Sequence, residues 1–165
     1  MIAMWKKLIV VTVLLLLFQR SVCGSTPLAL DIYNQIYHLQ PGANVKVAYD
    51  ILGNPQENTG SIGIIPPALF WHLEQNKTII IYLNNDSTIR YTLYREDYKQ
   101  RKLARERYEE LKEGFCTILG TPFDDYEGKV MWSVENFILG LTPPEGSGQH
   151  NSRVLVSLLH NMRLQ

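Results

Sequence analysis

Two short segments rich in β-branched and aromatic residues, separated by a polar turn, constrain the fold of this chain more than any other feature. Residues 77–83 (KTIIIYL) and 88–94 (TIRYTLY) flank residues 84–87 (NNDS). Such side chains favour strands, and a short polar turn between two such runs indicates a β-hairpin. The second run alternates apolar and polar residues, so we expect one face of its strand to meet solvent.

A long polar helix is expected directly after this hairpin, at residues 96–113 (EDYKQRKLARERYEELKE). Its apolar residues recur at helical spacing and form a narrow stripe: Leu103, Ala104, Tyr108 and Leu111. The other positions are mostly charged. A helix with this pattern lies on the surface of a domain and packs one face against a sheet.

The remaining segments give weaker indications. Residues 28–39 have helical spacing and are followed by a proline and a glycine, so a short N-terminal helix is expected there. Residues 44–52 alternate and predict a strand, and residues 129–141 are expected to be extended. Residues 68–73 and 154–159 are apolar but fit a strand or a helix equally well.

The order of these elements predicts an α+β fold. The strands do not alternate with helices as βαβ units do, so antiparallel pairing is expected. We expect either an antiparallel sheet or a partial β-barrel, with one long surface helix at about residues 96–113 and a short N-terminal helix. No internal repeat is evident in the sequence.

The first 24 residues have the pattern of a cleaved secretory signal peptide. Lys6 and Lys7 precede an apolar run at residues 8–18, and small residues surround a cleavage site after Gly24. The apolar run is too short to cross a bilayer as a helix. Residues 1–24 are therefore predicted to be a signal peptide and residues 25–165 a single globular secreted domain, with no stable membrane span after cleavage.

Signal cleavage would remove Cys23 and leave Cys116 as the one cysteine of the mature chain. Three alternatives follow for this thiol. It is buried and inert, it forms an intermolecular disulfide that links a dimer, or it is a catalytic nucleophile with His72 or His160 as its base. The apolar neighbours of Cys116 favour the buried thiol.

The sequence offers no motif for a metal or a cofactor. No two of the four histidines fall at the spacing of zinc ligands, and no Cys-x-x-Cys pair occurs. The acidic residues 124–127 lack the ligand spacing of a calcium loop, and no glycine-rich phosphate loop is present. With a formal net charge of zero, nothing indicates nucleic-acid binding. We therefore expect no metal, no cofactor and no enzymatic activity.

Two kinds of candidate site remain. Asn76 and Asn85 each begin an N-x-[ST] acceptor sequence for N-glycosylation, at the start and at the turn of the expected hairpin. Tyr82, Tyr91 and Trp132 fall on expected strands and are candidates to line a cavity for an apolar ligand, because their rings are apolar with a polar tip. Ordinary core packing is the alternative for these three aromatic residues.

Residues 78–125 resemble the C-terminal end of secreted lipocalins, in which the last barrel strands are followed by a surface helix and a Leu-Gly turn. The residues that carry the resemblance are Leu93, Tyr94, Glu110, Leu111, Lys112, Glu113, Phe115, Leu119, Gly120, Pro122 and Asp124. The resemblance implies a lipocalin-like barrel that carries a small apolar ligand.

Three functions follow from these observations. We expect first a secreted, non-enzymatic binding protein that carries a small apolar ligand. The alternative is a secreted effector that acts through contact with an extracellular protein, and the third is a secreted hydrolase.

Overall fold

The computed structural model describes residues 25–61, 65–74, 76–144 and 152–160 of the 165-residue chain. The predicted signal peptide, residues 1–24, lies outside the described residues. The helices are α2 (Ser25–Tyr37), α3 (Lys46–Leu52) and α4 (Arg101–Leu119). The strands are β1 (Glu57–Thr59), β2 (Ala68–Glu74), β3 (Lys77–Leu83), β4 (Ile89–Tyr98), β5 (Asp124–Tyr126), β6 (Lys129–Val134), β7 (Phe137–Thr142) and β8 (Ser152–His160).

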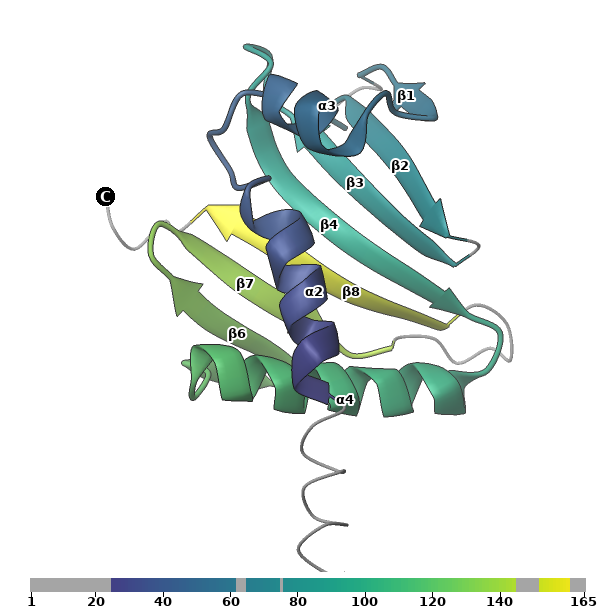
Figure 1. Ribbon diagram of the computed structural model, residues 1–165, viewed down its shortest axis with the longest axis vertical. Helices are drawn as coiled ribbons and strands as arrows, with labels where there is room; N and C mark the ends of the chain where they lie inside the picture. The colour runs from purple at the N-terminus through teal and green to yellow at the C-terminus, as the bar shows by residue number, and fades with distance from the viewer. Residues whose placement is uncertain (1–24, 62–64, 75, 145–151, 161–165) are drawn as a thin grey trace, which may run out of the picture.

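The eight strands form one antiparallel sheet in the order β1-β2-β3-β4-β8-β7-β6-β5 (Figure 1). The predicted α+β fold with an antiparallel sheet is confirmed. Strands β1 and β5 are the two edges, so the sheet is open and does not close into a barrel. The predicted hairpin is also confirmed, since β3 pairs with β4 across the turn at residues 84–88.

The long helix begins later and ends later than predicted. Residues 96–98 continue β4 instead of opening the helix, because β8 pairs with this end of β4 from Tyr98↔Ser152 to Thr92↔Leu158. Helix α4 then runs from Arg101 to Leu119. A partner strand from a distant part of the chain thus overrides the local helical pattern.

The strand predicted at residues 44–52 is wrong, because these residues form a turn and helix α3. Ala48 is fully buried, and Val45 and Leu52 pack against the same core. These three residues are spaced by three and four positions, which is the helical period hidden under the alternation. The Asn44 side chain accepts a hydrogen bond from the Lys46 amide at 2.9 Å, which supports the start of the helix.

The segments that the sequence left undecided or weakly indicated form regular strands and a helix. Residues 68–74 and 152–160 are strands β2 and β8, and the extended segment predicted at 129–141 is the hairpin of β6 and β7. The N-terminal helix is confirmed as α2, although it ends at Tyr37.

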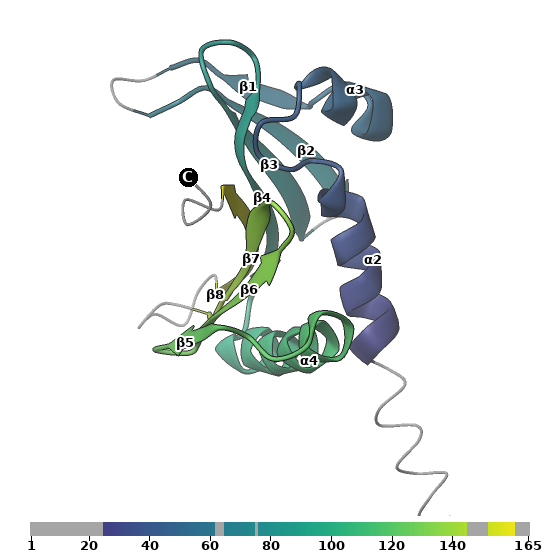
Figure 2. The same ribbon diagram turned by 90° about the vertical axis from the view of Figure 1, so that its left-hand side faces the viewer.

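The helices cover one face of the sheet and leave the other without a helix among the described residues (Figure 2). Helix α2 packs on α4 and β4. The largest fully buried side chains include Trp71, Trp132, Tyr94, Phe115 and Phe137. The hydrophobic core therefore lies between the helices and the inner face of the sheet.

The sheet consists of two similar halves, β1–β4 and β5–β8. Helix α3 ends at Leu52-Gly53-Asn54-Pro55 and helix α4 ends at Leu119-Gly120-Thr121-Pro122. The backbone angles are φ 76°, ψ −156° at Gly53 and φ 81°, ψ −157° at Gly120. A four-strand meander follows in both halves.

Each half contains an equivalent hydrogen bond from a tryptophan indole to a glycine carbonyl oxygen. Trp71 on β2 donates from Nε1 to the Gly53 carbonyl oxygen, and Trp132 on β6 donates to the Gly120 carbonyl oxygen, both at 3.0 Å. We call these two contacts the indole latches. Each fixes the end of a helix against the second strand of its half.

Strand registers relate the two halves by an approximate twofold axis. The Trp71↔Ile79 pair in the first half corresponds to Trp132↔Leu139 in the second. Where the halves meet, the register gives Tyr94↔Val156, Leu93↔Ser157 and Thr92↔Leu158, so the axis passes through the Leu93–Ser157 pair. The sequence signal for this duplication is the repeated Leu-Gly-x-Pro, which is too short to recognise alone.

Gly120→Ala is expected to destabilise the fold by about 1–3 kcal/mol, because essentially only glycine adopts the φ and ψ angles found at Gly120. An added Cβ would meet no atom within 4 Å, so the cost arises from the backbone alone. Urea denaturation of this variant and of Gly60→Ala measures it. Gly60 has equally open space and no positive φ, so its substitution should change stability by less than about 0.5 kcal/mol. Equal effects of the two variants would contradict the expectation.

Candidate functional site

The outer face of the sheet, which no described helix covers, carries a continuous row of directly paired residues. Across the strands it reads Glu57, Phe70, Ile80, Leu93, Ser157, Gly140, Met131 and Asp124. We call these residues the outer row. Its centre is the Leu93–Ser157 pair on the approximate twofold axis, and its two ends are carboxylates on the edge strands.

Further apolar side chains flank the outer row on the same face. They are Tyr82, Tyr91, Ile138, Leu155 and Leu159, by the alternation and pairing of their strands. None of them, and none of the apolar members of the outer row, belongs to the core cluster or packs against it. Most are half-buried, while Ile80 is 4% exposed. The outer face is therefore a second apolar surface, separate from the core.

An arginine pair beside the outer row shares one carboxylate. Asp97 Oδ2 lies 2.9 Å from Arg95 Nε, and Asp97 Oδ1 lies 3.0 Å from Arg153 Nε. The Arg95 Nε atom is buried. Although it lies close to Asp97, it does not form a hydrogen bond of good geometry with any described atom. Two guanidinium groups and one carboxylate leave one net positive charge on this part of the face.

The structure brings together two of the three aromatic residues predicted to line a ligand cavity. The rings of Tyr82 and Tyr91 stack on the outer face, with centroids 4.3 Å apart and an interplanar angle of 19°. Trp132 lies on the opposite face, 1% exposed in the core, where it contacts Phe115.

A buried charged cluster lies between β4 and α4. The Arg107 guanidinium donates to both Glu96 carboxylate oxygens at 2.7 Å, and the hydroxyls of Tyr94 and Tyr98 donate to the same carboxylate at 2.7 and 2.5 Å. Glu96 is fully buried. Burial opposes ionisation, but the bonds from Arg107, Tyr98 and Tyr94 outweigh it and hold the Glu96 pKa below its ordinary value. All of these donors are used within the fold, so the cluster supports stability.

Alkaline pH is expected to unfold the protein through the same cluster. Burial, followed by the charge of Glu96 for Tyr94 and the hydrogen bond to Glu96 for Tyr98, raises the pKa of both tyrosines well above the ordinary value. The unfolded chain ionises these tyrosines near pH 10, so the native state loses stability as pH rises above about 10. An ultraviolet titration of tyrosinate should show that both ionise only together with unfolding. Reversible titration of every tyrosine in the folded protein would contradict this.

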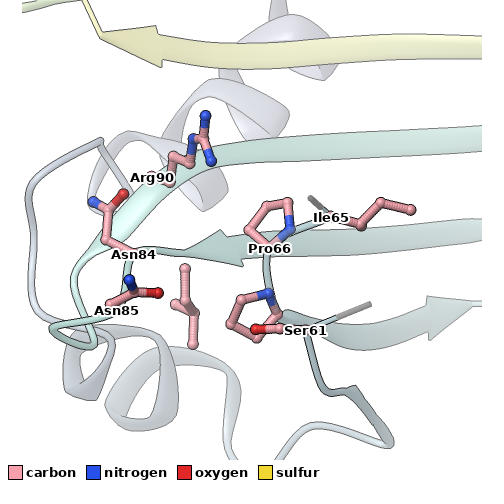
Figure 3. A pocket seen from close by; sticks show the side chains of 8 residues that line it. Ser61, Ile65, Pro66, Asn84, Asn85 and Arg90 are labelled. Carbon is pink, nitrogen blue, oxygen red and sulfur yellow. The ribbon is translucent and has the colours of Figure 1, made fainter. Parts of the chain in front are cut away.

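Two surface hollows contain polar residues. The smaller, about 220 Å³, lies between the β3–β4 turn and the segment before β2, and its lining includes Asn84, Asn85, Pro66 and Arg90 (Figure 3). The larger, about 420 Å³, lies between α4 and the β5–β6 turn beside Arg105 and Pro143. Sites for drug-sized ligands usually range from about 300 to 1,000 Å³, so the smaller hollow is below that range.

The two predicted glycosylation sites lie on turns. Asn85 is exposed in the β3–β4 turn, and Asn76 is half-buried in the β2–β3 turn. The Asn76 carbonyl accepts a bond from the Asp97 amide at 2.9 Å. Glycan attachment at both remains a prediction. Cys116 lies half-buried on α4 and packs against the core.

Within the described residues, no group of three or more histidine, cysteine, aspartate or glutamate side chains could hold a metal ion. None of the described helices combines the length and apolarity needed to span a membrane.

The sequence indicated the apolar alternation of the outer face but not its charged group. Arg95, Asp97 and Arg153 were missed because the first two were placed at the end of the hairpin and the start of a helix. Only the pairing of β4 with β8 brings Arg153 beside Asp97, since they are 56 residues apart in the chain.

Comparison with known proteins identifies neither a family nor a function. No family model matches the sequence, and no curated protein matches it. Among solved structures, the chain is similar to a DUF4309 family protein, YjgB, from Bacillus subtilis. The two are 14% identical, with a TM-score of 0.43, over 72% of this chain and 78% of that chain.

Proposed function

We propose that this chain is a secreted, non-enzymatic binding protein that acts through contact with another protein. The observation that supports the proposal is the outer face, where the apolar members of the outer row and the apolar side chains that flank them cover the six strands from β2 to β6 without a described helix. Protein interfaces combine an apolar, aromatic centre with a more polar rim. The outer face has this composition, with apolar side chains in the middle and carboxylates on both edge strands.

The breadth of the face favours a protein over a small ligand. A small-molecule site usually encloses most of its ligand in a concave pocket. Here the apolar side chains lie side by side on an open sheet, from Phe70 on β2 to Met131 on β6. The stacked Tyr82–Tyr91 pair favours the alternative of a small apolar ligand, so the experiment must separate the two.

A photo-crosslinking amino acid at position 91 tests the proposal in the cells that produce the protein. We expect position 91 to yield one defined crosslinked protein and position 49, on α3 at the helix-covered face of the sheet, to yield none. Tyr49 is 38% exposed and serves as the matched control. Leu93→Asp should abolish the crosslink from position 91.

A polarity-sensitive fluorescent lipid provides the opposing test. Saturable, displaceable binding of this probe at micromolar concentration, together with no protein crosslink from position 91, would replace the proposed function with that of an apolar-ligand carrier. Crosslinks that form equally from both positions would also contradict the proposal.

A further inference from the structure

We infer that the protein partner presents an aspartate or glutamate side chain to Arg95, carried on an otherwise apolar loop that lies on the centre of the outer face. This inference rests on the proposed function and adds the chemistry of the partner. It follows from the local charge balance and from the position of Arg95 in the sheet.

Arg95 lies next to the central Leu93–Ser157 pair of the face. It is two residues from Leu93 on β4, and its direct neighbours across the sheet are Thr78 on β3 and Leu155 on β8. Neither neighbour carries a charge. Among the described residues, Asp97 is the acidic side chain that contacts Arg95, and Arg153 contacts it as well.

A partner that covers this face must satisfy Arg95. The side chain is 24% exposed. Covering it would remove it from solvent while Asp97 remains shared between two guanidinium groups, and a buried charge without a full partner is strongly unfavourable. A carboxylate from the partner would bring the group to two positive and two negative charges. Arginine also binds carboxylates well because its planar fork donates two parallel bonds.

The edges of the outer row limit how many acidic groups the partner can carry. Glu57 and Asp124 end the row on β1 and β5. An extended acidic surface would meet like charges there, which disfavours it. A single carboxylate among apolar residues fits both the basic centre and the acidic edges. The small residues Ser157 and Gly140 on one side of the axis leave more room above the sheet than Ile80 and Leu93 on the other.

Selection from a library of disulfide-closed random peptide loops on the immobilised folded protein tests the inference. We expect the selected loops to share one aspartate or glutamate flanked by apolar or aromatic residues. Replacing that residue by asparagine or glutamine should weaken binding about tenfold or more, as for other hydrogen bonds to charged groups. Arg95→Met should weaken the original loop by a similar factor, whereas Arg105→Met, an exposed control on α4, should not.

The outcomes distinguish this inference from the proposed function. Loops that lose binding with Leu93→Asp but lack an acidic residue, and that tolerate Arg95→Met, would overturn the inference and leave the proposed function standing. Loops that bind Leu93→Asp and wild type equally, or a library that yields no binding loop, would count against both. The loop variants keep the test valid if Arg95→Met fails to fold.

Discussion

Arg107→Met is expected to destabilise the protein by about 3–5 kcal/mol. Removal of the guanidinium leaves the Glu96 carboxylate fully buried without its bidentate partner. Breaking a buried ion pair by removing one partner typically has this cost, because the remaining charge keeps its desolvation penalty. The two tyrosine hydroxyls that also donate to Glu96 cannot replace the lost positive charge.

Chemical denaturation of Arg107→Met beside two further variants measures this effect. Lys102→Met removes an exposed ion pair with Glu106, at 3.8 Å, and should cost less than about 1 kcal/mol. The double variant Glu96→Leu, Arg107→Met removes both charges and should recover much of the lost stability. A loss below about 1 kcal/mol for Arg107→Met would show that Glu96 is protonated or rehydrated in the native state.

Trp132→Ala and Trp71→Ala are each expected to cost about 3–5 kcal/mol, because each truncation leaves a large cavity in the core. Both indoles are 1% exposed, and each forms one of the two indole latches. The phenylalanine variants separate packing from the hydrogen bond. Trp71→Phe and Trp132→Phe retain an aromatic ring but leave a glycine carbonyl oxygen unpaired, which costs about 1–3 kcal/mol.

The approximate twofold symmetry predicts that the two phenylalanine variants have similar effects. Urea denaturation of both, with Leu103→Ala as a control, measures this. Leu103 is 46% exposed on α4, so its truncation should change stability by less than about 0.5 kcal/mol. If one phenylalanine variant were neutral and the other severely destabilised, the two latches would not be equivalent and the structural duplication would have no energetic counterpart.

Several elements of this fold could be predicted from local sequence, and the failures of prediction have specific physical causes. The β3–β4 hairpin was predictable because its turn and its β-branched residues act over a short distance. The alternation of residues 44–52 predicts a strand and hides the helical spacing of Val45, Ala48 and Leu52. Residues 96–98 were assigned to the helix because nothing local shows that β8 pairs with them.

The candidate site was less predictable than the elements. Tyr82 and Tyr91 were identified from the sequence, and their strands place them together. Trp132 lies on the other face of the sheet, and the sequence does not show this because alternation predicts two faces for a strand but does not say which one the helices will cover. The contact of Arg153 with Asp97 requires strand β8, which follows α4 and the β6–β7 hairpin in the chain. No local sequence pattern therefore predicts the arginine pair.

The sequence by itself determined the fold class, the hairpin, the presence of a long amphipathic helix and the alternation of apolar residues in the strands. These properties depend on backbone preferences and on side chains within a few residues of one another. Only the tertiary structure decided that β4 pairs with β8, that the sheet is two similar halves and that its outer face is apolar with an arginine pair beside the centre. These features arise from contacts between residues distant in the chain, where pairing energies over the whole sheet, rather than local preferences, select the arrangement.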